Sequence, residues 1–161
     1  MLDGPLRPAK DRLLDPLTRG PLRAVPPMAM SVLALAAALA AAVAAWQQLA
    51  AAAVMLWLIS RIADGLDGAL ARHQEVATDG GGLVDIVFDT IGYAAIPLGV
   101  AAGVDTRAAW VTVAVLLATF YVNAVSWTYL AALLEKRNAG ATALGVSTST
   151  VMPRGLVEGT E

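Results

Sequence analysis

The sequence has 161 residues, of which 58% are hydrophobic and 15% are charged, and its mean hydropathy is +0.66. Soluble domains average about 45–50% apolar and about 25% charged residues, so this composition indicates a membrane protein. The net charge of −2 argues against binding to nucleic acid, which normally needs a basic surface. The absence of cysteine excludes disulfide bonds and thiolate metal sites.

The N-terminal arm, residues 1–27, places basic residues between leucines and prolines. Within 11–22, Leu13, Leu14 and Leu17 recur at nearly helical spacing. Apolar residues on one face and basic residues beside them are typical of a helix lying on a membrane surface. We therefore predict a short interfacial amphipathic helix here, and a basic tail without regular structure is the alternative.

Four apolar stretches follow and predict an all-α, polytopic transmembrane helix bundle over residues 28–136. The first, 28–46, contains no charged residue and is about long enough to cross a hydrocarbon core of ~30 Å. The others begin after Gln48, at about Leu83 and at Ala108. Short joins are expected at 47–48, at a glycine-rich turn around 79–82 and at 105–107. Residues 137–161 are expected to form a cytoplasmic loop.

The distribution of basic residues predicts the orientation of the bundle. Four spans would place the N-terminal arm, the 61–82 region and the segment after Leu134 on one side, together with ten of the eleven lysines and arginines. Only Arg107 would lie on the other side. Because basic residues concentrate in cytoplasmic segments, we expect the N-terminus and the 61–82 region to face the cytoplasm.

Two pairs of acidic residues lie at this predicted cytoplasmic edge. Asp64 and Asp67 are three residues apart, and Asp85 and Asp89 are four apart, so each pair projects from one helical face. The two helices are joined by a short segment and run antiparallel, which predicts that the four carboxylates converge. Such a group is costly without cations, and carboxylate oxygens suit hard divalent ions such as Mg²⁺ or Mn²⁺.

Simpler interpretations exist for the individual residues. Asp64 could only terminate a helix, and Arg72 could be an ordinary cytoplasmic anchor. His73 is expected to be a solvated loop residue, as are Glu75 and Asp79. The tyrosines and tryptophans are expected to serve packing or the membrane interface. Arg61 and Arg72 are the only nearby basic residues that could offset the acidic charge, and Gly99 with Gly103 forms a small-xxx-small pair that could mark a helix contact.

The segment 64–89 resembles the signature of the CDP-alcohol phosphatidyltransferase family. That signature has two acids three residues apart, Gly, Ala-Arg, a further Gly, and two acids four residues apart. This sequence matches every fixed position, with Asp64, Asp67, Gly68, Ala71, Arg72, Gly81, Asp85 and Asp89.

The resemblance implies an integral enzyme of a bacterial-type inner membrane, commonly a homodimer, that acts in phospholipid biosynthesis. It would transfer a phosphatidyl or other phosphoalcohol group from a CDP-alcohol, such as CDP-diacylglycerol, to an acceptor alcohol and release CMP. Two Mg²⁺ or Mn²⁺ ions would be held by Asp64, Asp67, Asp85 and Asp89. Asp89 would also act as the general base. Gly68, Ala71, Arg72 and Gly81 would bind the CDP moiety.

Two departures from the family pattern leave other functions open. Relatives usually have six spans, whereas four are predicted here, so an inactive fragment or a partner subunit is an alternative. Many relatives carry a Pro-Asn-x-x-Thr element before the first span, and the matching positions here are Pro27, Met28 and Ser31. A cation-transport protein, in which the same acids bind the transported ion, is the third possibility.

Overall fold

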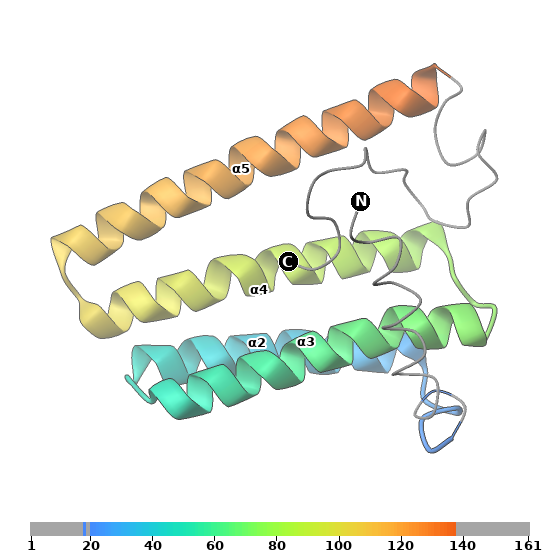
Figure 1. Cartoon of the computed structure of the whole chain (residues 1–161), viewed down its shortest axis with the longest axis horizontal. Coiled ribbons are helices and arrows are strands. Elements are labelled where there is room, and N and C mark those ends of the chain that lie inside the picture. The colour runs from blue at the N-terminus through green and yellow to red at the C-terminus, as the bar shows by residue number, and fades with distance from the viewer. Residues whose placement is uncertain (1–17, 19, 138–161) are drawn as a thin grey trace, which may run out of the picture. The chain divides into compact units, whose positions relative to one another are not determined.

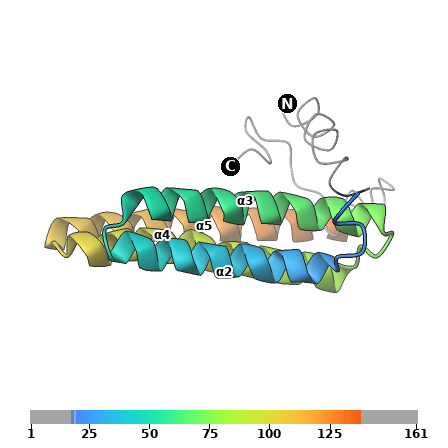
Figure 2. The ribbon, with the colours of Figure 1, turned by 90° about the horizontal axis from the view of Figure 1, so that it is seen from below.

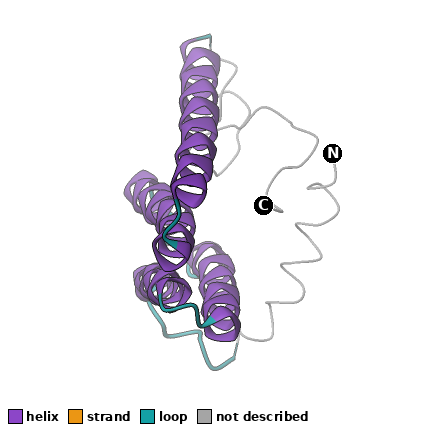
Figure 3. Cartoon of the chain, turned by 90° about the vertical axis from the view of Figure 1, so that its left-hand side faces the viewer, coloured by secondary structure: helices purple, strands orange, loops and turns teal. Residues whose placement is uncertain are grey.

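The computed structural model describes residue 18 and residues 20–137, and most of them belong to four helices. Figure 1 labels these helices α2 (Pro27–Trp46), α3 (Ala50–His73), α4 (Asp79–Val104) and α5 (Arg107–Lys136). The described residues include no strand (Figure 3). The predicted all-α fold is therefore confirmed, and each helix covers one of the four predicted apolar stretches.

Three of these helices, α2, α4 and α5, are long and apolar enough to cross a membrane by length and composition. Helix α3 is not among them, although it has 24 residues. Its C-terminal half carries Arg61, Asp64, Asp67 and Arg72, so its apolar part is short. The four helices agree with a helical membrane bundle, and the crossing of α3 stays a prediction.

Helix α2 is the element on which both α3 and α4 pack (Figure 2). It begins after Pro26, which is extended, and Pro27 occupies the first turn, where a missing N–H breaks no hydrogen bond. One side of the helix is buried and consists of small residues, which lets neighbouring helices approach closely. These buried residues are Ser31, Ala34, Ala37, Ala38, Ala41 and Ala44.

Glycines on α4 make the contact between α2 and α4 possible. A Cβ atom at Gly103 would lie 2.7 Å from the carbonyl oxygen of Ala45, and a Cβ at Gly99 would overlap the backbone of Ala42. Gln48, in the turn after α2, also donates a side-chain hydrogen bond to the carbonyl of Gly103. The small-xxx-small pair predicted from the sequence is thus a real helix contact.

The start of α4 differs from the sequence prediction. The expected glycine-rich turn at 79–82 is wrong, because these residues form the first turn of α4. Thr78 is extended, and its Oγ1 accepts a 3.1 Å hydrogen bond from the backbone N–H of Gly81. Such an N-cap stabilises a helix by about 1 kcal/mol, and Asp79 in the first turn suits the positive end of the helix dipole. The cap and the acidic first turn therefore offset part of the low helix propensity of the glycines.

The segment between α3 and α4 holds the described end of the N-terminal arm. Gln74 Nε2 donates hydrogen bonds to the carbonyl oxygens of Arg23 (3.1 Å) and Val25 (2.8 Å). Residues 20–24 form turns. Most of the predicted amphipathic helix in 1–27 lies outside the described residues, as does nearly all of the predicted loop at 137–161. Helices α2, α3 and α4 belong to one compact unit, Leu17–Leu117, and the site described next lies within it.

Candidate metal and phosphate-transfer site

Three carboxyl groups from two helices meet between α3 and α4. Asp64, Asp67 and Asp85 each offer an oxygen atom, and these atoms all lie within 4.8 Å of one another. Asp67 is buried, with 5% of its surface exposed, and the other two are partly buried. The i,i+3 spacing on α3 and the antiparallel approach of α4 bring them together. The structure thus joins three of the four predicted acids in one group.

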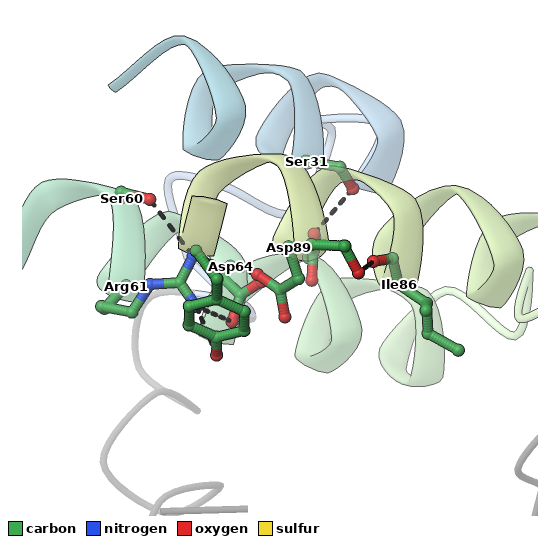
Figure 4. A network of polar contacts seen from close by, with 9 residues as sticks. Ser31, Ser60, Arg61, Asp64, Ile86 and Asp89 are labelled. Carbon is green, nitrogen blue, oxygen red and sulfur yellow. Dashed lines mark hydrogen bonds and ion pairs between the residues drawn. The ribbon is translucent and has the colours of Figure 1, made fainter. Parts of the chain in front are cut away.

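The fourth acid, Asp89, lies beside this group but is paired with an arginine. Arg61 Nη2 lies 3.0 Å from Asp89 Oδ1, and Arg61 Nη1 lies 3.6 Å from Asp64 Oδ2. Figure 4 shows the guanidinium beside the side chains of Asp64 and Asp89. One cation from α3 therefore bridges the acid pair of its own helix and the acid pair of α4.

Two more side chains fix the guanidinium of Arg61. Its Nη1 donates a 3.2 Å hydrogen bond to the hydroxyl of Tyr93, and its Cζ lies 5.2 Å from the centre of the Tyr93 ring. Its Nη2 lies 3.3 Å from Ser60 Oγ. From the sequence, Arg61 was expected only to offset acidic charge, and Tyr93 was expected to serve packing or the membrane interface. Arg61 lies three residues before Asp64, and Tyr93 lies four residues after Asp89. Each of them therefore shares a helical face with that acid, and this spacing was the signal missed in the sequence.

Helix α2 contributes a hydroxyl group to the site. Ser31 Oγ donates a 2.6 Å hydrogen bond to Asp67 Oδ2 (Figure 4), while the carbonyl oxygen of Pro27 lies 3.4 Å from the same hydroxyl. Ser31 was identified from the sequence only as a position of the Pro-Asn-x-x-Thr element. A polar residue on the buried side of an apolar helix was the available signal for a role at the site.

The charges and the size of the site fit a divalent cation. Ionised carboxylates about 4–5 Å apart repel one another by about 3 kcal/mol per pair at an effective dielectric constant near 20, and Arg61 supplies only one compensating charge. The donor set consists of hard oxygen atoms, which Mg²⁺ and Mn²⁺ prefer. The acids, Arg61 and Ser31 surround a cavity of about 10 Å³, which is roughly the space needed for one water molecule.

The four residues predicted to bind a CDP moiety lie near this cavity without lining it. Gly68 and Ala71 follow Asp67 on α3, and a Cβ at Gly68 would lie 3.2 Å from Arg72 Nη1, so the Arg72 side chain passes over Gly68. Gly81 is in the first turn of α4, where its N–H bonds to the N-cap. These residues occupy the ends of α3 and α4 next to the acids, and their binding role stays a prediction.

Comparison with known protein families matches residues 24–153 to the CDP-alcohol phosphatidyltransferase family. The chain belongs to this family. The match extends across all the described helices and includes every acid of the site. CDP-alcohol phosphatidyltransferases generally use divalent metal ions, in agreement with the carboxylate group of Asp64, Asp67 and Asp85.

One curated relative is the inner membrane protein YnjF of Escherichia coli (strain K12). It is 52% identical over 48 residues, which cover 30% of this chain and 23% of the relative. The matched stretch therefore spans about a quarter of the relative's length. No solved structure matches the chain.

Proposed function

We propose that this member of the CDP-alcohol phosphatidyltransferase family transfers a phosphoalcohol group from a CDP-alcohol to an acceptor alcohol and releases CMP. CDP-diacylglycerol is the proposed donor, and the reaction would serve phospholipid biosynthesis. The observation that carries this proposal is the meeting of Asp64, Asp67 and Asp85 within 4.8 Å at the junction of α3 and α4. This is the arrangement of oxygen donors that divalent-metal phosphate chemistry requires.

Asp64, Asp67 and Asp85 would hold Mg²⁺ or Mn²⁺, with Asp89 completing the set for a second ion. Bound divalent ions would polarise the phosphate oxygens of the donor and offset the charge that develops during transfer. Gly68, Ala71, Arg72 and Gly81, at the neighbouring helix ends, would bind the CDP moiety. The small residues leave room beside the backbone, and the guanidinium of Arg72 can bind a phosphate oxygen.

Asp89 would act as the general base. The hydroxyl oxygen of the acceptor forms a bond to the phosphorus that carries the lipid, its proton moves to the Asp89 carboxylate, and the bond from phosphorus to the CMP oxygen breaks with its electron pair. A carboxylate within hydrogen-bonding reach of the hydroxyl can take this proton. The 3.0 Å contact with Arg61 fixes the position of Asp89.

The proposed location is a bacterial-type inner membrane, with the site facing the cytoplasm. Three helices have the length and composition to cross a membrane, and the relative YnjF is an inner membrane protein. The concentration of lysine and arginine on the side of the acids supports this orientation. A homodimer is proposed from the family, and membrane lipid would surround the many exposed apolar side chains of α2 to α5.

The proposal is tested with the full chain in lipid nanodiscs, supplied with CDP-diacylglycerol and a panel of labelled alcohols. We expect CMP release and a labelled lipid product with Mg²⁺ or Mn²⁺, and neither with EDTA. Asp89→Asn should abolish both. Its matched control is Asp105→Asn, after the other end of α4, where Asn tolerates the left-handed backbone of that residue (φ 46°).

Turnover in Asp89→Asn close to that of the unmodified chain would show that Asp89 is not the base. Absence of CMP release with every alcohol of the panel, from a folded chain that binds Mn²⁺, would contradict the transferase proposal. The panel also identifies the acceptor, because glycerol phosphate, inositol phosphate and serine give different lipid products.

A further inference from the structure

The guanidinium of Arg61 contacts acids of both acidic helices, α3 and α4. It contacts Asp89 at 3.0 Å and Asp64 at 3.6 Å, and these carboxylates belong to opposite helices. We propose that Arg61 is a positioning residue that competes with the second divalent ion for Asp89, so that the two ions bind in a fixed order. This inference rests on the proposed function, because it concerns the metal ions which that function requires.

The first ion has a preformed set of ligands, and Arg61 contacts one of them, Asp64. Asp64, Asp67 and Asp85 already lie within 4.8 Å of one another, whereas Asp89 is outside this group. The cavity of about 10 Å³ is roughly large enough for one water-sized occupant. One ion can therefore enter the described arrangement, and a second needs a carboxylate that Arg61 now holds.

Arg61 is held in its place by more than the acids. The hydroxyl and the ring face of Tyr93 contact its guanidinium at 3.2 Å and 5.2 Å, and Ser60 Oγ lies at 3.3 Å. Contact with an aromatic face and several hydrogen bonds favour one geometry of the planar guanidinium. Tyr93 lies one helical turn after Asp89 on α4, so the same helix presents the carboxylate and the residue that keeps Arg61 beside it.

An ordinary surface ion pair is the simpler explanation of these contacts. Exposed pairs at i,i+3 on one helix contribute little, and the pair of Arg61 with Asp64 is of that kind. The shorter contact, however, joins α3 to α4 across 28 positions of the chain and involves a hydrogen bond to Asp89. If Arg61 were only a surface charge of α3, contacts with Tyr93 of α4 would not be expected.

The test is a Mn²⁺ titration of the full chain in nanodiscs of neutral lipid, followed by electron paramagnetic resonance of the free ion. We expect two binding phases in the unmodified chain. In Arg61→Gln the second phase should tighten about fivefold or more, because a partly buried ion pair no longer competes, and the first should change less. In Arg61→Lys the change should be smaller, since lysine keeps the charge but cannot bridge two carboxylates in the same way.

Two further variants separate competition from a general effect of charge or of folding. Arg107→Gln removes the same charge at the start of α5, beyond the other end of α4, and should leave both phases unchanged. Tyr93→Leu, at an exposed position, leaves Arg61 in place with fewer contacts and should tighten the second phase in the same direction by a smaller factor.

The outcomes distinguish this inference from the function on which it rests. A second phase that is unchanged or weaker in Arg61→Gln would overturn the role of Arg61 while leaving the metal site intact. If Arg61→Gln does not fold, Tyr93→Leu decides in the same way. Absence of Mn²⁺ binding by the unmodified chain would contradict the proposed function itself, and the inference with it.

Discussion

Ser31 on α2 donates a 2.6 Å hydrogen bond to the buried carboxyl group of Asp67 on α3. This bond ties the helix that carries no acid to the most buried acid of the candidate site. Because α2 also packs against α4, the bond links the position of Asp67 to the helix on which both acidic helices rest.

Replacing Ser31 with alanine should reduce turnover about tenfold and weaken the site's hold on a divalent ion. A hydrogen bond to a charged group contributes about 1.5–3 kcal/mol, and its loss leaves the Asp67 carboxyl free to rotate away from Asp64 and Asp85. Ser31→Thr retains the hydroxyl and should preserve turnover. Rates of CMP release for the three chains check this prediction, and equal rates in the alanine and threonine variants would contradict it.

Removing one carboxylate from the group of three should weaken metal binding strongly. In Asp85→Asn an amide oxygen replaces a charged ligand, and we expect the affinity for Mn²⁺ to fall at least about tenfold because one full charge interaction is lost. Asp79→Asn makes the same change at an exposed residue in the first turn of the same helix and should leave the affinity unchanged. Calorimetric titration measures both, and similar losses in the two variants would show that only the general negative charge matters.

Close packing of α4 on α2 predicts that a single methyl group at Gly99 destabilises the bundle. A Cβ there overlaps the backbone of Ala42, which cannot move aside as a flexible side chain would. We expect Gly99→Ala to lower the melting temperature clearly, at a cost of about 1–3 kcal/mol. Gly80→Ala, also on α4, meets no atom within 4 Å and should leave stability unchanged or slightly higher.

Circular dichroism of the chain in detergent during heating compares these two glycine variants directly. An equal melting temperature for Gly99→Ala and the unmodified chain would show that the helices separate easily at this point.

Gln74 should protect the end of the N-terminal arm from proteolysis. Its side-chain amide bonds to the carbonyls of Arg23 and Val25, so Gln74→Ala releases the backbone on both sides of a trypsin site. We expect cleavage after Arg23 to become a few times faster, since cleavage follows the population of locally open states. Gln47→Ala, at an exposed position after α2, serves as the control. Equal cleavage rates in the two variants would show that the hydrogen bonds of Gln74 do not hold the arm in place.

The sequence was sufficient to predict the helices and the approach of the acids. Long apolar stretches identified α2, α4 and α5, and the spacing of Asp64, Asp67 and Asp85 predicted that their side chains share the space between two helices. Gly99 and Gly103 were also noted as a pair that could mark a helix contact. These features depend on periodicity and residue size, which are local properties of the sequence.

The remaining features depend on how the helices are rotated and capped. Asp89 is paired with Arg61 and lies outside the group formed by Asp64, Asp67 and Asp85, and the sequence did not predict this pairing. The hydrogen bond from Ser31 to Asp67 depends on the packing of α2 against α3, which the sequence alone does not specify. The first turn of α4 was missed because glycines at 80–82 disfavour a helix, whereas the side chain of Thr78 caps it in the structure.

The most direct test of the central claim is anomalous diffraction from crystals of the full chain grown with Mn²⁺ and measured near the manganese absorption edge. The account predicts a strong anomalous peak between α3 and α4, within coordination distance of carboxylate oxygens from Asp64, Asp67 and Asp85. A well-ordered structure with these side chains in place and no peak between them would contradict it.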